Sequence, residues 1–383
     1  MVRILTAALL LALATPVLAA PHEVDITWMS IANWSFKLND LRIVMDGYIT
    51  RVPENIFVPG PGTDVFAYTS EYWPVDVAAV TRVHDALQAD GQLDYLLAGH
   101  SHFDHTYDTA TWSLLTGAPI IGGLSTCYQA QAQHIPESQC VVVVGGEVFD
   151  LGHGVTMHVV RWNHSGNNTN PIQHFARELS APPIPDPLTG GFRAGVGEDF
   201  PNGGGGRAFL FKIENPGGPV SFFVNNSASA YDLTQPIVVN GVDYGAPLAN
   251  LKAAMERAGL GGVDVWIGTG GAPVAQLVVP VLHPKVYVPN HWDGLFNPFE
   301  GGMPFPFKDA VLEAYLDENG IVLMPQRQYF DTYRIDAHGV TMVPNHSVKQ
   351  KLGFPDVQPF PAATAQLVSA VQKTHGPDHC NDD

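Results

Sequence analysis

His100-Ser101-His102-Phe103-Asp104-His105 carries the strongest signal in this chain. It combines three imidazoles and a carboxylate, which are side chains that commonly bind divalent metals. An apolar run over 93–98 comes before it and predicts a buried strand. Because side chains alternate along an extended chain, we expect His100 and His102 to face one point. Asp104 and His105 should then face a second point nearby, so the sequence predicts two cation positions side by side.

Three further polar residues come shortly after apolar runs that predict strands: His164, Asn226 and His291. The ends of strands on one side of a sheet are where α/β proteins collect functional side chains. We therefore expect these residues to lie near the histidine motif.

In order and spacing, these motifs resemble the metallo-β-lactamase-fold hydrolase superfamily over nearly the whole chain after the leader. Pro289-Asn290-His291-Trp292-Asp293-Gly294 and Asp46-Gly47 look most similar to the branch that contains ascorbate-phosphate lactonase and the N-acylethanolamine phospholipid phosphodiesterases. The resemblance implies an α/β fold, built as a four-layer αββα sandwich. It also implies a first metal held by His100, His102 and His164, and a second held by Asp104, His105 and His291.

Asn226 departs from the superfamily pattern, which usually has an aspartate there that bridges both metals. An amide oxygen is neutral and bridges poorly. One expectation is a weaker second metal and a site that holds one ion in practice. The other is two bound ions with a more acidic shared water, because a negative charge is missing. Asn226 could instead orient the substrate.

The ligand types point to the cofactor and the reaction. Imidazole and carboxylate ligands without a thiolate suit one or two Zn²⁺ ions, with Mn²⁺ or Fe as alternatives. Such metals lower the pKa of a bound water to about 7, and Asp104 is expected to orient that nucleophile or collect its proton. We expect a metal-dependent hydrolase acting on a carboxylic ester, lactone or amide. A phosphodiesterase, an iron-dependent oxygenase and a metal-binding protein without turnover are the alternatives.

Other polar and aromatic residues receive weaker expectations. Asp46 and Asp293 could each support a ligand histidine through a hydrogen bond, and Tyr107 could donate to an oxyanion; ordinary structural roles are the alternative for all three. Five other histidines are expected to be structural or exposed: His84, His153, His158, His174 and His283. Three tryptophans are expected at the rim of the site: Trp34, Trp73 and Trp292.

Composition limits the class of partner. The chain has 383 residues, 45% of them hydrophobic, and a net charge of −18. Nucleic acids and anionic membranes attract basic surfaces, so this charge disfavours both and favours a small-molecule substrate. The oligomeric state is not readable from the sequence.

The N-terminus predicts export. Arg3, the apolar run 4–13 and small residues before position 20 are typical of a signal peptide over 1–19. No later segment has the roughly 20 apolar residues that span a bilayer, so we expect a periplasmic or secreted protein of bacterial type. Cys127 and Cys140 could form a disulfide in that compartment, with unpaired thiols as the alternative.

The remainder, 20–383, is expected to form one domain with an insertion at about 166–206 that is rich in Gly, Pro and Asn and covers the site as a mobile rim. Periodicity predicts helices over 75–89, 109–115, 247–258, 274–279 and 308–316. It predicts strands over 24–28, 41–47, 93–98, 141–144, 155–160, 207–213, 220–224, 263–267, 285–288, 320–324 and 340–343.

Overall fold

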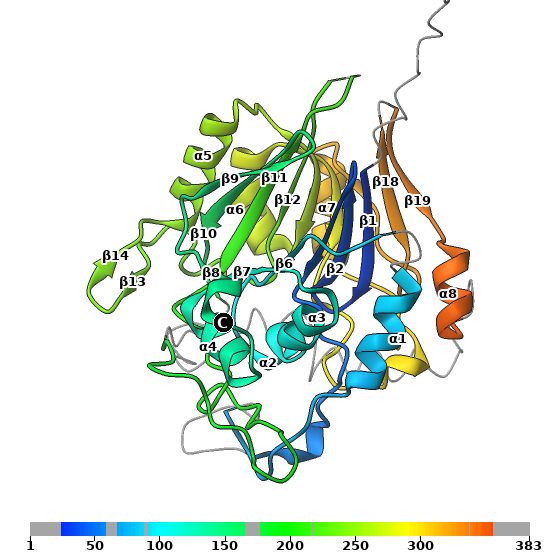
Figure 1. Cartoon of the computed structure of the whole chain (residues 1–383). Coiled ribbons are helices and arrows are strands. Elements are labelled where there is room, and N and C mark those ends of the chain that lie inside the picture. Colours follow the sequence, from blue (N-terminus) through cyan, green and yellow to red (C-terminus); the bar gives the residue numbers. More distant parts are fainter. Residues whose placement is uncertain are drawn as a thin grey trace, which may run out of the picture.

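Two large β-sheets face each other, and helices cover both outer faces, as the computed structural model shows (Figure 1). The structure describes residues 24–58, 67–87, 91–164, 177–216, 218–336 and 338–354. The predicted leader 1–19 lies outside these ranges. The αββα sandwich expected from the sequence is confirmed.

The first sheet has eight strands and mixes antiparallel and parallel pairs. Its spatial order is β19 (Gly339–Val343), β18 (Thr332–Asp336), β1 (Val24–Ser30), β2 (Asn33–Leu38), β3 (Leu41–Met45), β6 (Tyr95–Leu97), β7 (Ile120–Gly122) and β8 (Cys140–Val142). The pairs from β19 to β3 are antiparallel, and those from β3 to β8 are parallel.

The second sheet has seven strands with the same mixture. Its order is β17 (Val322–Leu323), β16 (Pro284–Pro289), β15 (Val263–Gly268), β12 (Val220–Val224), β11 (Arg207–Ile213), β10 (Val155–Arg161) and β9 (Val148–Gly152). The pairs from β17 to β12 are parallel, and those from β12 to β9 are antiparallel. Two short hairpins complete the strands: β4 (Phe57–Val58) with β5 (Tyr68–Thr69), and β13 (Val238–Val239) with β14 (Val242–Asp243).

Side chains of the second sheet alternate between two apolar clusters, because successive residues of a strand point to opposite faces. One cluster lies between the two sheets and the other lies under the covering helices. Phe211 and Phe222 point to the first sheet, where their ring centroids lie 5.9 and 5.2 Å from that of Phe36. Leu210 and Phe223, one residue away on the same strands, belong to the cluster formed with the covering helices. Both faces of this sheet are therefore buried, which explains its nearly continuous apolar strands.

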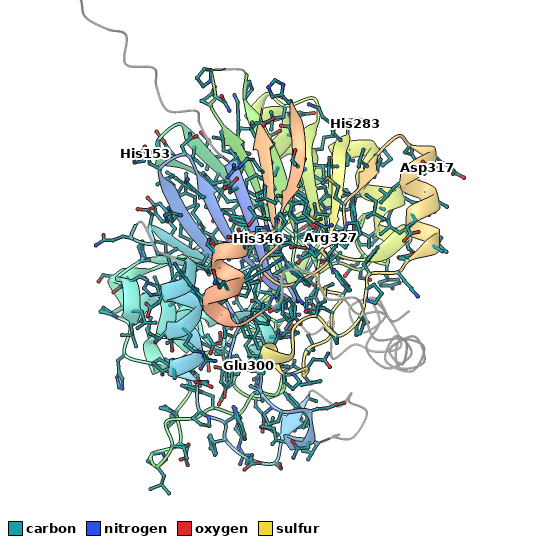
Figure 2. All side chains as sticks on the ribbon, turned by 90° about the vertical axis from the view of Figure 1, so that its right-hand side faces the viewer. His153, His283, Glu300, Asp317, Arg327 and His346 are labelled. Atoms are coloured by element: carbon teal, nitrogen blue, oxygen red, sulfur yellow. A yellow bond between two sulfur atoms is a disulfide. The ribbon has the colours of Figure 1, made fainter. Side chains whose placement is uncertain are left out.

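The helices form the two outer layers. On the second sheet, α5 (Pro247–Ala258) packs on β10, and α6 (Gly271–Leu282) lies between α5 and α7 (Ala310–Glu318). On the first sheet lie α1 (Val77–Leu87), α3 (Thr109–Thr116), α4 (Leu124–Ala132) and α8 (His346–Leu352), while the short α2 (Phe103–Thr106) follows β6. Figure 2 labels Asp317 on α7 and His346 on α8 in these two layers.

Most predicted elements are confirmed, with α5 matching its predicted range 247–258. Several other bounds differ by two or more residues. The largest difference is in α6, which is longer than the predicted 274–279, and β3 ends at Met45, so that Asp46-Gly47 form the following turn. The sequence analysis missed several elements, among them β2, β7, β9, β18, α4 and α8.

The part of the insertion that the structure describes, 177–206, contains no helix or strand but is anchored. Trp73 and Phe192 exchange two backbone hydrogen bonds of 2.9 Å, and the Thr69 backbone N–H donates to the Glu198 carboxylate at 2.9 Å. The mobility expected of this segment stays a prediction.

Candidate metal centre

The candidate ligands lie where strands of both sheets end. The loop after β6 carries His100 and His102, and α2 carries Asp104 and His105. His164 follows β10, and His291 follows β16. The structure thus brings together all six residues that the sequence analysis assigned to metals.

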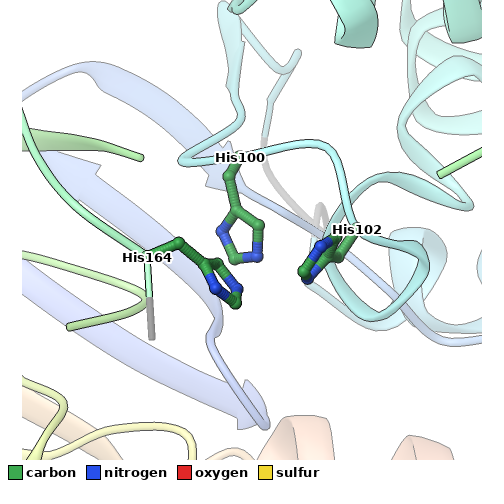
Figure 3. Close-up of side chains that lie close together, drawn as sticks. All are labelled: His100, His102 and His164. Carbon is green, nitrogen blue, oxygen red and sulfur yellow. The ribbon is translucent and has the colours of Figure 1, made fainter. Parts of the chain in front are cut away.

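His100, His102 and His164 form the first group, and their rings point toward one another (Figure 3). Their ring centroids lie 4.4 to 4.7 Å apart. One nitrogen from each ring lies within 4.8 Å of the others, and all three residues are buried. These distances suit three ligands around one cation.

Asp104, His105 and His291 form the second group, whose ligand atoms also lie within 4.8 Å of one another. Asp104 Oδ2 is 3.1 Å from His105 Nε2 and 2.9 Å from His291 Nε2. The His100 and His105 ring centroids are only 3.9 Å apart, so the two groups are adjacent.

A change of backbone conformation inside the motif separates the two groups. His102 is extended, with φ −66° and ψ 158°, and α2 begins at the next residue. The His102 carbonyl accepts hydrogen bonds from the backbone N–H groups of His105 and Thr106 at 3.1 and 2.9 Å. The switch from extended chain to helix turns Asp104 and His105 away from the direction of His100 and His102.

Asp46 holds the histidine motif in place through hydrogen bonds to Gly99 and His105. Its Oδ1 accepts a 3.0 Å hydrogen bond from the Gly99 backbone N–H, and its Oδ2 lies 2.8 Å from His105 Nδ1. The turn that places it needs glycine at the next position: Gly47 has φ +82°, and a Cβ there would lie 2.8 Å from Trp112 Nε1. Holding Nδ1 leaves Nε2 of His105 for a metal, as hydrogen-bonded carboxylates do for metal-ligating histidines elsewhere.

Asn226 lies against the Nδ1 sides of His100 and His105. Its Nδ2 donates to Asp46 Oδ2 at 2.8 Å, and its Oδ1 lies 3.2 Å from His100 Nδ1. The close approach depends on Gly99, where a Cβ would lie 2.0 Å from Asn226 Nδ2. Asn226 therefore supports the ligand rings from outside.

His100 and His102 are in the neutral state that metal binding requires, and His100 has a ring nitrogen available as a ligand atom. Burial, together with the charges of neighbouring histidines, holds the pKa of both His100 and His102 well below the usual value, so these rings are neutral at neutral pH. His100 Nε2 is buried and has no hydrogen-bond partner, which is costly unless a ligand binds there. The residues present therefore fit a pair of borderline metal ions.

The second group, unlike the first, contains charged side chains. Burial alone would lower the pKa of His105, but Asp104 and Asp46 outweigh it and raise this pKa to about 9. Burial would raise the pKa of Asp104, yet His105 and His291 hold it well below its usual range. Without a metal, His105 is therefore a cation between two carboxylates.

We expect metal binding at the second group to release this proton. The raised pKa stabilises the metal-free fold fully below about 6.5, and this contribution is lost as the pH rises through about 9. Affinity for the ion should then increase by up to about tenfold per pH unit from pH 7 toward 9. Titration calorimetry in buffers of different ionisation enthalpy should show close to one proton released; no proton release would contradict the protonated state.

Replacing Asp46 with asparagine should weaken metal binding about 10- to 100-fold, the usual cost of losing the hydrogen-bond support of a ligand. The amide keeps the shape but loses the charge that holds His105. Competition with a fluorescent chelator measures the affinity. Asp150→Asn, which changes an exposed carboxylate on β9, is the control and should leave the affinity unchanged.

For two neighbouring residues, Tyr107 and Asp293, the contacts favour the structural alternative named in the sequence analysis. The Tyr107 hydroxyl donates to the Trp73 carbonyl, so this residue anchors a loop and is not placed as an oxyanion donor. Asp293 accepts from the Ile31 backbone N–H at 2.9 Å and the Tyr329 hydroxyl at 2.8 Å, so it fixes the backbone of the His291 loop rather than the ring.

The tryptophans were also misplaced. Trp34 and Trp292 are buried in the core, where they donate to Asn290 Oδ1 and Gln326 Oε1. Trp73 is partly buried and pairs with Phe192. Outside both ligand groups lie His84, His153, His158 and His283, and Figure 2 labels two of them, His153 and His283, on turns of the sandwich. His174 lies outside the described residues.

The sequence analysis missed Gln129 of α4. Its Nε2 donates to the carbonyls of Ser101 and Asp199 at 2.8 and 2.9 Å, and its Oε1 accepts from the Thr106 hydroxyl at 2.7 Å. Gln129 thus joins the loop of the first group, the helix of the second and the anchored segment 177–206. A disulfide between Cys127 and Cys140 fastens the same helix to β8.

Together the sandwich and its two groups of ligands define a protein of the metallo-β-lactamase fold with a candidate site for two metal ions. Part of the chain is similar to curated UPF0173 metal-dependent hydrolases: it is 34% identical over 77 residues to one from Pyrobaculum islandicum, and 29% identical over 98 residues to one from Pyrobaculum calidifontis. These regions are 20% and 26% of this chain, and the chain spans only 34% and 39% of the relatives' length. No family model matches the chain.

The expected resemblance to metal-dependent hydrolases is thereby confirmed for this part of the chain, while the branch named above stays a prediction. Similar solved structures include Igni18, a metallo hydrolase from Ignicoccus hospitalis, with 13% identity, a TM-score of 0.47 and coverage of 82% of this chain and 99% of that one. An isothiocyanate hydrolase from Delia radicum gut bacteria has 12% identity, a TM-score of 0.46 and coverage of 80% and 98%. At this distance, we transfer no reaction from either.

Proposed function

We propose that this chain is an exported metal-dependent hydrolase that cleaves a carboxylic ester, lactone or amide. The observation that carries the proposal is the convergence of two adjacent groups of ligand side chains, each able to hold one cation. The local similarity to UPF0173 metal-dependent hydrolases supports the class of reaction.

In this proposal, His100, His102 and His164 hold one ion, and Asp104, His105 and His291 hold the other. Zinc is the proposed metal because the donors are imidazoles and a carboxylate. When bound, such ions polarise a substrate oxygen and lower the pKa of a water toward neutrality. Asp46 and Asn226 keep the His100 and His105 rings in place.

Asp104 is the proposed catalytic carboxylate. It is held ionised, because His105 and His291 keep its pKa well below the usual range. Its carboxylate therefore can orient a nucleophile or accept its proton at an oxygen atom.

The electrostatics of the site favour a neutral scissile group over a phosphodiester. The groups that act most strongly on His100, His102, Asp104 and His105 are one another, Asp46, His164 and His291. No lysine or arginine is among them, whereas phosphate sites commonly use these side chains.

Two observations support export. The leader pattern of residues 1–19 is one, and the Cys127–Cys140 disulfide is the other, since such bonds persist in oxidising compartments. Within the described ranges, no helix has the length and apolar character to cross a membrane. N-terminal sequencing of the protein from a periplasmic fraction tests this proposal, and an N-terminus that still begins at Met1 would refute it.

The experiment for the reaction combines metal removal with a substrate screen. The purified chain is treated with a chelator and assayed on aryl esters, lactones, amides and phosphodiesters before and after zinc is restored. We expect hydrolysis of a carboxylic substrate that disappears with the metal and returns with zinc. Hydrolysis indifferent to chelation would overturn the proposal, and so would oxygen consumption by an iron-loaded protein without hydrolysis.

A further inference from the structure

A second site, separate from the six candidate ligands, lies beside the end of β10 in the seven-stranded sheet. It is a cavity of about 80 Å³ between the end of β10, the turn 144–146 and α5, and Arg161 and Arg257 line it. In Figure 1, α5 lies beside β10 at this end of the sheet. This volume is several times the roughly 10–15 Å³ that one ordered water needs, so the cavity can hold one tetrahedral oxyanion.

Arg161 forms the inner wall of the cavity and is only 3% exposed. Its Nη1 donates to the Val144 carbonyl at 3.2 Å, and its guanidinium lies 4.3 Å from the centre of the Tyr244 ring. Its buried Nε has no hydrogen-bond partner. Within the described ranges, these direct contacts of the cation are all with neutral groups, although a buried charge normally has a charged partner.

A second buried arginine adds to the positive charge. Arg207 pairs with Arg161 across β10 and β11 and is 1% exposed. It donates to the carbonyls of Val143, Gly203 and Gly205 at 2.7 to 3.0 Å, which are again neutral groups. Burial and the charge of Arg161 lower the pKa of Arg207 to about 9.

The two glutamates whose charges act on these arginines lie outside the cavity. Glu147 and Glu178 act on both arginines from a distance, but neither lines the cavity. The Glu147 carboxylate accepts the Val144 and Gly145 backbone N–H groups at 2.7 and 2.8 Å.

Arg257 stands at the mouth. This exposed residue in the last turn of α5 uses its Nη1 to donate to the Gly146 carbonyl at 2.7 Å. The polar residues that share the lining are Tyr244 and Asn250, and no aspartate or glutamate lines it. That is notable in a chain with 37 acidic and 19 basic residues.

We propose that this cavity binds a single tetrahedral oxyanion, namely inorganic phosphate or the terminal phosphate of an organic molecule. Arg257 contacts the anion directly, and the charges of Arg161 and Arg207 attract it from the inner side. Guanidinium groups match the oxygens of phosphate in geometry and charge.

The position of this cavity links it to the first ligand group. Arg161 lies three residues before His164, and the Arg207 backbone N–H donates to the Gly99 carbonyl at 2.7 Å, next to His100. A bound anion therefore stabilises the two segments that carry these histidines without contacting the metals.

The test is titration calorimetry of the full chain as purified, with sodium sulfate and sodium phosphate at constant ionic strength. We expect saturable binding of one anion at this cavity. Arg257→Gln should weaken it at least about tenfold, because a charge-assisted contact is lost. Lys252→Gln removes an equal charge from an exposed position of the same helix, outside the lining, and should leave binding unchanged.

A second variant tests the charge without removing an arginine. Ala253 is exposed on α5 and lines the cavity, so Ala253→Glu can supply a carboxylate from within the chain. This variant should raise the unfolding temperature of the anion-free protein and abolish the response to sulfate. The absence of saturable binding in the unaltered chain would overturn the proposal, as would wild-type affinity in Arg257→Gln.

The same titration distinguishes the two sources of the ligand. Equal affinity for inorganic phosphate and glycerol phosphate indicates that the site accepts the terminal phosphate of an organic molecule. Tighter binding of inorganic phosphate indicates that the site accepts only the free ion. Acetate that binds as tightly as phosphate contradicts a tetrahedral site.

Discussion

Replacing His102 by alanine is expected to remove one metal ion per chain and to lower hydrolysis at least about a thousandfold, because metal-ion catalysis contributes several kcal/mol. His102 supplies one of the three nitrogens of the first group, and its ring lies 4.7 and 4.4 Å from those of His100 and His164. No other described His, Cys, Asp or Glu joins this group. Two ligands hold an ion far less tightly than three. Metal analysis of the purified variant and its rate on the best substrate of the screen check the prediction.

The matched control for this substitution is His283→Asn. His283 is an exposed residue after α6 in a left-handed conformation, φ +45°, which asparagine also adopts readily. Metal content and rate should stay as in the unaltered chain. If His102→Ala retained its full metal content, the first group would not be a metal site, whatever the rate.

The candidate ligands could be predicted because their positions depend on local geometry. Alternation after β6 and the start of α2 set the directions of the motif's side chains. His164 and His291 come shortly after strands β10 and β16 of the second sheet. The position of Asn226 could not be predicted, because it depends on contacts distant in sequence. Its carboxamide packs over Gly99 and bonds to Asp46, which come just after two strands of the other sheet, β6 and β3.

The missed elements lack the periodic signal for physical reasons. Helix α4 buries the polar residues Ser125 and Gln129, which bond to the backbone of other segments, so its buried face is not apolar in sequence. Strand β2 carries Trp34, which the sequence analysis expected at the rim of the site. Its indole Nε1 donates to Asn290 inside the protein, at 3.0 Å, and the ring is fully buried.

Replacing Lys349 by methionine is expected to destabilise the fold by about 3–5 kcal/mol, the usual cost of removing one partner of a buried ion pair. Lys349 on α8 is fully buried, and its Nζ bonds to the Asp331 carboxylate, which is also buried. Methionine has a similar length but leaves the Asp331 charge without its partner. Urea denaturation monitored by tryptophan fluorescence measures the change. Lys351→Met, at an exposed position of the same helix, should change stability by less than about 0.5 kcal/mol.

A double variant separates the lost charge partner from lost packing. Asp331 Oδ2 also accepts the backbone N–H groups of Arg327 and Gln328 at 2.9 and 3.0 Å, and an amide oxygen can replace it there. Lys349→Met with Asp331→Asn should therefore recover part of the stability lost in the single variant. The consequence reaches the metal centre, because this turn leads into Tyr329, whose hydroxyl donates to Asp293 in the His291 loop. We expect Lys349→Met to weaken the second metal more than the first, and equal weakening of both would show that α8 acts through global stability alone.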